Sequence, residues 1–207
     1  MARKTKEDAQ LTKDAILDAA VDVIFKKGLS YVTMADIADA ANVSRGAVYG
    51  HYKGKVEVAL AMCQRAVEQV EQLDKRAEET CLQYLYRLGL HQLRLSVEPS
   101  DIQRVLFILY TKIDDEASLM ALRREWELAY RDQVHHWLLQ AVKHGELPHD
   151  LNHELAATYL QALLDGIFCM VYWYSHGDGK QWAQGELLFQ VGFETLQHSP
   201  KFRRQAS

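Results

Sequence analysis

The sequence predicts an all-α protein. It contains only three prolines and eleven glycines among 207 residues, so few residues interrupt helices. Apolar residues recur at helical spacing along most of the chain, and no useful length alternates apolar and polar residues as a half-buried strand does. Hydrophobic residues make up 48% of the chain, which is ample for a packed core. We therefore expect successive amphipathic helices.

Three helices are expected before residue 55, and their apolar spacing and capping residues define them. The first has apolar residues at Ile16, Ala20 and Ile24, which lie on one face, and Gly28 suits the position just after its end. The expected helices are residues 12–27, 34–41 and 45–52.

The two short helices and the turn between them predict a helix-turn-helix. Thr33, with Asp36 three residues later, resembles a capping box with Asp in the Glu position. Asn42 tolerates the left-handed conformation of a tight turn, and Ser44 can cap the next helix. A longer preceding helix braces the pair, as in DNA-binding helix-turn-helix units.

One face of the third helix has the chemistry of a DNA contact. At 100° per residue, Arg45, Gly46, Tyr49 and Gly50 share one arc, opposite Val48. Arginine forms bidentate bonds to guanine, glycine lets the backbone approach the groove, and a tyrosine hydroxyl suits a phosphate oxygen. The bland alternative is a small helical subdomain with polar surface residues.

The charge distribution supports a local contact with DNA. The net charge is -4, but residues 1–55 hold nine Lys and Arg against seven Asp and Glu, whereas residues 56–207 hold fifteen against twenty-one. A mildly basic head on an acidic body fits phosphate contact by the head alone. Two further groups are candidate phosphate ligands. Thr33 presents its hydroxyl and backbone N–H at a helix N-terminus, and Lys55 presents an ammonium group.

The rest of the chain is expected to be helical, without an enzyme active site. The expected helices are Val56–Gln83, Tyr84–Val97, Ile102–Ile113, Glu116–His144, His153–His176 and Lys180–Gln197. Walker, GxGxxG, HExxH and GxSxG motifs are absent. Adjacent His135 and His136, and His149 with His153, are poorly spaced for a metal, so no metal or cofactor is expected. The three cysteines are far apart and are interpreted as buried apolar thiols.

Residues 33–55, TMADIADAANVSRGAVYGHYKGK, resemble the DNA-binding signature of the TetR family of repressors. MARKTKEDA at the N-terminus, LPHDL at 147–151 and SPKFRR at 199–204 resemble its AcrR-type branch, which controls multidrug efflux pumps. The resemblance implies about nine helices, a homodimer on a palindromic double-stranded DNA operator, and release by a ligand. The predicted DNA-binding residues are Thr33, Ser44, Arg45, Gly46, Tyr49, Gly50, His51 and Lys55.

Two positions depart from the family pattern, and one is ambiguous. Asn42 replaces the usual glycine, which its tolerance of the left-handed region explains. Gly50 replaces a bulky, often aromatic residue, which puts the operator sequence in doubt. The helical wheel points His51 toward the core, whereas the resemblance places it on a phosphate.

The body is expected to hold an inducer site and a dimer interface. Aromatic, methionine and cysteine residues at helical spacing often belong to the hydrophobic core. The resemblance, however, places an apolar cavity among them. The acidic excess of the body suits a small lipophilic, cationic inducer. The candidate ligand-binding residues are Met62, Cys63, Phe107, Tyr110, Trp126 and Tyr130. Apolar stripes on the last two helices, the second including Leu187 and Leu196, suit a four-helix interface. Its candidate residues are Leu155, Tyr159, Leu163, Met170, Leu188 and Val191.

These observations predict a DNA-binding domain at residues 1–55 and a ligand-binding and dimerisation domain at 56–207. No secretory signal is visible, and the most apolar run, Gly166–Tyr174, is short for a membrane span, so a cytoplasmic protein without a membrane is expected. The expected function is a ligand-responsive repressor of a multidrug efflux operon. The alternatives are a small-molecule-binding protein of this fold with a vestigial DNA head, an activator, or, more distantly, a helical lyase or hydroxylase.

Overall fold

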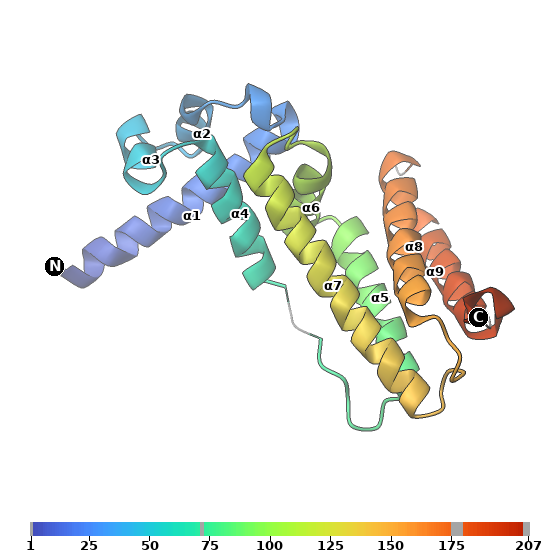
Figure 1. The fold of residues 1–207 in the computed structure, drawn as a ribbon. Helices are drawn as coiled ribbons and strands as arrows, with labels where there is room; N and C mark the ends of the chain where they lie inside the picture. The colour runs from blue at the N-terminus through green and yellow to red at the C-terminus, as the bar shows by residue number, and fades with distance from the viewer. Residues whose placement is uncertain (1, 71–72, 175–179, 205–207) are drawn as a thin grey trace. The chain divides into compact units, whose positions relative to one another are not determined.

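The computed structural model describes residues 2–70, 73–174 and 180–204, and within these ranges the secondary structure is helical (Figure 1). This confirms the predicted all-α class. The elements are α1 Ala2–Lys27, η1 Leu29–Tyr31, α2 Met34–Ala40, α3 Arg45–His51, α4 Lys55–Glu68, α5 Cys81–Val97, α6 Asp101–Thr111, α7 Ala117–Lys143, α8 His153–Tyr174, α9 Lys180–His198 and η2 Pro200–Phe202.

The chain divides into two compact units. The first unit comprises residues 1–71 and 99–125, and the second comprises residues 72–98 and 126–207. Helix α6 and the beginning of α7 therefore group with the helix-turn-helix, although they follow it in sequence by some fifty residues. The boundary at residue 55 predicted from the sequence remains a prediction.

The first unit is built around α1, which packs against α2, α4 and α6. The apolar stripe predicted for this helix forms its core side, since Ile16, Ala20 and Ile24 are fully buried. The helix begins at Ala2, ten residues before the predicted start. Residues 2–11 contain good helix formers and neither glycine nor proline, but they are too polar to show an apolar period.

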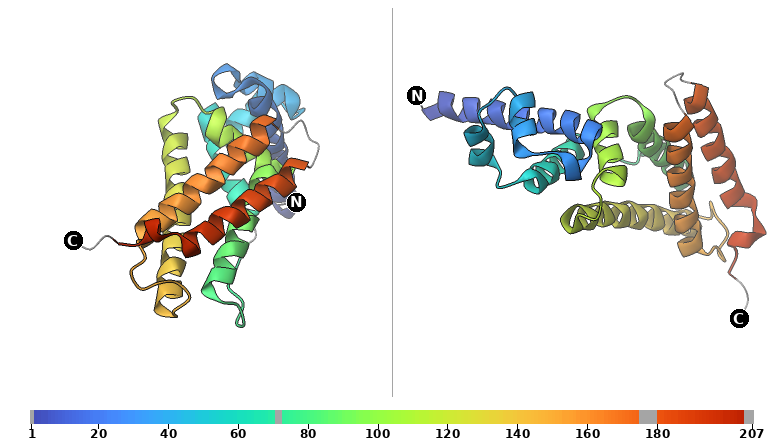
Figure 2. Two further views of the ribbon diagram at one scale, coloured as in Figure 1. Left: turned by 90° about the vertical axis from the view of Figure 1, so that its right-hand side faces the viewer. Right: turned by 90° about the horizontal axis from the view of Figure 1, so that it is seen from above.

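The second unit is built from α5, the later part of α7, α8 and α9, with η2 against α8. Helices α8 and α9 run side by side (Figure 2). The unit's core includes Leu93, Leu138 and Phe189, all less than 2% exposed. Gly89 on α5 lies directly under the Phe189 ring of α9, where any Cβ would overlap the ring. The close approach of these two helices therefore depends on glycine.

The predicted single helix from Val56 to Gln83 is wrong. Helix α4 ends at Glu68, and α5 begins at Cys81 with a complete capping box between Thr80 and Gln83. The intervening sequence, DKRAEE at 74–79, is mostly exposed and offers no apolar face to pack. The other predicted boundaries after residue 80 agree with the structure within three residues, except that the predicted end at His176 lies outside the described residues.

Helix α8 is long and apolar enough to cross a membrane by length and composition alone. The qualifying stretch is His153–Val171, with a mean hydropathy of 1.3 and one-third of it buried. It is longer than the run Gly166–Tyr174 identified from the sequence. A core or interface helix of a folded domain meets the same criteria, and α8 packs against both α5 and α9.

Candidate nucleic-acid interface

The start of α2 is fixed by the capping box predicted from the sequence. The backbone N–H of Asp36 donates to Thr33 Oγ1 at 3.1 Å, and the Thr33 N–H donates to Asp36 Oδ2 at 2.9 Å. Lys27, in the last turn of α1, donates to Asp36 Oδ1 at 2.7 Å. The hydrogen bond from Lys27, followed by those from the Thr33 backbone and hydroxyl, lowers the pKa of Asp36 to about 2. The carboxylate thus ties α2 to α1.

The turn after α2 and the start of α3 also follow the prediction. Asn42 has a φ of 53°, in the left-handed region that asparagine tolerates. The Ser44 hydroxyl accepts from the Ala47 N–H at 3.1 Å and caps α3. Val48 is fully buried and Tyr52 is 5% exposed, so one side of α3 is anchored in the core.

The opposite side of α3 is exposed. We call Arg45, Gly46, Tyr49 and Gly50 the recognition face; all four are exposed, and the Tyr49 side chain is 58% exposed. A Cβ added at Gly50 would meet no atom within 4 Å, so glycine leaves open space there. The face presents a cationic fork, a phenol and two stretches of bare backbone, which is the chemistry expected of a major-groove contact.

The three candidates that flank the recognition face differ in how many of their donor groups are available to a phosphate. His51 is half-buried, which is intermediate between the core position and the exposed phosphate contact considered from the sequence. Lys55 Nζ donates to the Ser30 carbonyl at 2.9 Å, which leaves its other N–H groups for a phosphate. Thr33 gives both its N–H and its hydroxyl proton to Asp36, so a phosphate there would have to share those donors.

Sequence reasoning missed one exposed aromatic residue next to this surface. Tyr31, the last residue of η1, is 81% exposed and follows Ser30, whose carbonyl holds Lys55. It lies in a short turn without helical periodicity, so no pattern marked it. The only available signal was an aromatic residue among the turn residues after Gly28.

The candidate ligand-binding residues are divided between the two units. Met62, Cys63, Phe107 and Tyr110 belong to the first, and Trp126 and Tyr130 belong to the second. In the first unit a cavity of about 300 Å³ lies among α1, α4 and α6. Its lining residues are Asp14, Asp18, Val21, Met62, Arg65, Ala66, Gln69, Asp101, Ile102 and Val105. Of the six candidates, only Met62 lines it.

The candidate interface residues of α8 and α9 fall into two groups. Leu155, Leu188 and Val191 are 45%, 39% and 51% exposed. The others, Tyr159, Leu163 and Met170, are partly buried against the core of the second unit. Leu196 is fully buried, so its place on the predicted outer stripe is wrong, whereas Leu187 is 58% exposed.

The cysteines only partly match their interpretation as buried thiols. Cys63 is fully buried, and burial raises its pKa to about 12. Cys81 is also buried, but Cys169 on α8 is exposed, which corrects the prediction. Position 169 lies on the side of α8 that faces away from the core residues Ile167 and Val171.

A family model described as "Bacterial regulatory proteins, tetR family" matches residues 16–62, which span α1 to α4. The crystal structure of MexZ, a repressor responsible for antibiotic resistance in Pseudomonas aeruginosa, is 43% identical with a TM-score of 0.87, covering 95% of this chain and all of that one.

Two further relatives match nearly the whole chain. The HTH-type transcriptional regulator TtgR of Pseudomonas putida is 29% identical over 99% of this chain and 100% of its own length. NalD, the secondary repressor of the MexAB-OprM multidrug efflux pump in P. aeruginosa, is 26% identical with a TM-score of 0.71, covering 93% of this chain and 99% of that one.

Proposed function

Because this chain belongs to the TetR family of bacterial regulatory proteins, we propose that it is a ligand-responsive repressor that binds a palindromic operator as a homodimer. Its target, on this proposal, is a multidrug efflux operon, and its place of action is the cytoplasm. The observation that carries the proposal is the recognition face of α3, held outward by the Ser44 cap and the buried Val48. A regulator of this kind needs no catalytic residue.

In this proposal Arg45 reads base edges, and Tyr49 with Lys55 contacts the backbone phosphates. The bidentate guanidinium supplies discrimination, whereas the phosphate contacts supply affinity and register. Ser44, at the N-terminus of α3, and Thr33, at that of α2, lie where helix N–H groups favour an anion. Gly46 and Gly50 allow the α3 backbone to approach the groove closely.

The efflux target is proposed from the relatives. NalD is a repressor of a multidrug efflux pump, and MexZ is a repressor responsible for antibiotic resistance. Both align with nearly the whole of this chain, body included, and therefore with the part that would receive the signal.

The inducer class is proposed from the cavity of the first unit. Its lining includes the apolar side chains of Val21, Met62 and Val105 and the carboxylates of Asp14, Asp18 and Asp101. Arg65 pairs with Asp18 at 2.6 Å and with Asp14 at 3.8 Å, and Arg104 pairs with Asp101 at 3.6 Å. Apolar side chains beside three carboxylates, which outnumber the two arginines paired with them, suit a lipophilic cation, whose entry would alter contacts among α1, α4 and α6.

The function is tested by footprinting a DNA fragment from upstream of the protein's own gene. We expect a footprint with two-fold symmetry, affinity that falls steeply with salt, and release by lipophilic cationic dyes. Absence of binding at low salt would contradict the repressor and favour a small-molecule-binding protein with a vestigial head. Binding that raises transcription in vitro would identify an activator instead.

A further inference from the structure

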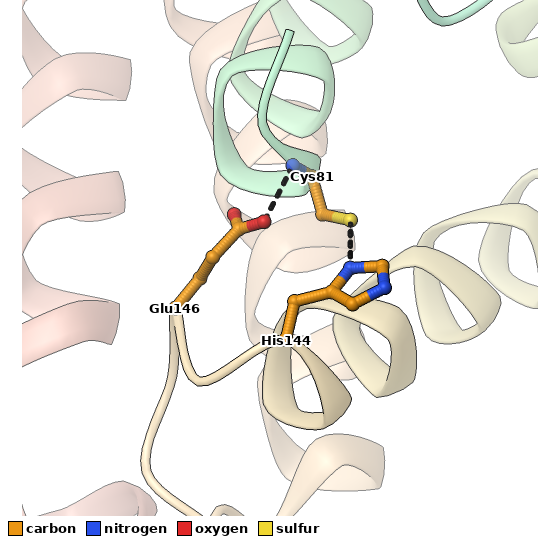
Figure 3. A group of neighbouring side chains, drawn as sticks. All are labelled: Cys81, His144 and Glu146. Carbon is orange, nitrogen blue, oxygen red and sulfur yellow. Dashed lines mark hydrogen bonds between the residues drawn. The ribbon is translucent and has the colours of Figure 1, made fainter.

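The second unit brings together three metal-ligating side chains that are far apart in the sequence. Cys81 is the first residue of α5, while His144 and Glu146 follow the end of α7 (Figure 3). Their ligand atoms all lie within 4.8 Å of one another, and Cys81 Sγ is 3.5 Å from His144 Nδ1. Sixty-three residues separate Cys81 from His144 along the chain, which is why no sequence motif marked the cluster.

We propose that Cys81, His144 and Glu146 bind a thiophilic divalent cation of the zinc class. A thiolate, an imidazole and a carboxylate form a ligand set that Zn²⁺ takes in proteins. At tetrahedral angles, with Zn–S of about 2.3 Å and Zn–N of about 2.0–2.1 Å, a bound sulfur and nitrogen lie about 3.5 Å apart. The Cys81–His144 separation already has this length.

The carboxylate of Glu146 is held in place by the first turn of α5. Its Oε1 accepts from the Cys81 N–H at 3.0 Å, and its Oε2 accepts from the Leu82 N–H at 2.8 Å. Each carboxylate oxygen has a second lone pair, so these bonds orient the group and still allow one oxygen to bind a metal. The ligand is thus pre-oriented at the thiol.

A reactive redox thiol is the rival explanation of the cluster. Burial, followed by the charge of Glu146, raises the pKa of Cys81, whereas a reactive cysteine needs a lowered one. A coordinated metal ion removes this obstacle because it deprotonates its thiol ligand outright. His144 is exposed, so solvent can supply the fourth ligand and give the ion a route in.

A bound ion would fasten the start of α5 to the loop after α7 within the second unit. Both segments lie at the end of their helices, where backbone groups fray most readily. Because the metal binds the folded cluster and not the separated residues, it stabilises the fold by an amount that grows with the logarithm of the free metal concentration above the dissociation constant.

The test is a Co²⁺ titration of the reduced, chelator-treated full chain, followed by displacement with Zn²⁺. We expect one Co²⁺ per chain, the visible spectrum of tetrahedral cobalt, and a sulfur-to-cobalt charge-transfer band that Zn²⁺ abolishes. Zn²⁺ should also raise the melting temperature. Cys81→Ser should remove the charge-transfer band, and His144→Ala should weaken binding at least tenfold.

Matched controls use a thiol and an imidazole outside the cluster. Cys169→Ser and His136→Ala both alter exposed residues, and neither should change the titration. If Cys81→Ser does not fold, His144→Ala decides, because its side chain is exposed and its loss should leave the circular dichroism spectrum intact.

Three results would overturn the proposal. The first is the absence of a thiolate band in the unaltered chain, and the second is unchanged binding by His144→Ala. The third is binding lost on His153→Ala. That result would place the ion at the other histidine contact, where His135 Nε2 lies 2.6 Å from His153 Nδ1.

Discussion

Two exposed surfaces of this protein differ in what they require of a partner. The recognition face of α3 is polar and contains two glycines, whereas α8 and α9 expose four large aliphatic side chains, Leu155, Leu187, Leu188 and Val191. A polar surface is stable in water without a partner, so it can bind a charged partner reversibly. A row of exposed aliphatic side chains is stabilised by permanent burial. The first therefore suits reversible binding to DNA, and the second suits a lasting protein interface.

The largest effect is expected at the α9 surface. In the proposed homodimer, Val191→Glu should weaken subunit association by about 3–5 kcal/mol, roughly a hundred- to several-thousand-fold, because two-fold symmetry would bury the charge twice without a partner. Sedimentation equilibrium measures the dissociation constant. Leu139→Glu on α7 is the matched control, since Leu139 is 40% exposed and outside α8 and α9. An unchanged association constant in Val191→Glu would show that the interface lies elsewhere.

The next largest effect is on the folding of the second unit. Gly89→Ala places a methyl group in the Phe189 ring, which is 1% exposed and stacks with Tyr86 at a centroid distance of 5.6 Å. The ring has little room to move, so we expect a loss of about 3 kcal/mol in the free energy of unfolding, measured in urea. A neutral result would mean that α5 and α9 separate readily.

The recognition face should show a purely functional effect. Arg45→Ala should weaken operator binding by about 1–3 kcal/mol, because a bidentate base contact is lost. Its free energy of unfolding should not change, since Arg45 is exposed. Mobility shifts at fixed salt measure the loss, and Arg124→Ala, an exposed arginine of α7, should bind as the unaltered protein does.

A glycine substitution in α3 should raise the free energy of unfolding, whereas the one in α5 should lower it. Gly50→Ala meets no atom within 4 Å, so the added methyl should stabilise the fold by about 0.4–1 kcal/mol. Urea unfolding alongside Gly89→Ala makes the comparison direct. A loss of stability at Gly50 would show that the open space around it is filled in the native protein.

The smallest effect concerns acid stability of the head. The folded-state pKa of Asp36 is about 2, below its ordinary value of 3.8, so its contribution is full above about pH 4 and is lost as the pH falls toward 2. Asp36→Asn should therefore flatten the fall of the urea midpoint over this window. Asp39→Asn, an exposed change in the same helix, should keep the original slope.

Some features of the fold could be predicted from local sequence, and others could not. The capping and turn residues of the helix-turn-helix were predictable from the sequence, because Thr33, Asn42 and Ser44 act on backbone groups within three residues. The break between α4 and α5 was not, because the apolar spacing of residues 56–73 continues past the point where α4 ends. Its only local sign is the Thr80 capping box.

The sequence alone determined the helical class, the caps of α2 and α3, and the outward arc of the recognition face, since each depends on neighbours within about one helical turn. The tertiary structure decided which side chains of α8 and α9 stay exposed, that α6 joins the first unit, and that Leu196 is core. It also decided the meeting of Cys81 with His144 and Glu146. Such contacts join segments many residues apart, and helical periodicity gives the direction of a side chain but not the element it will meet.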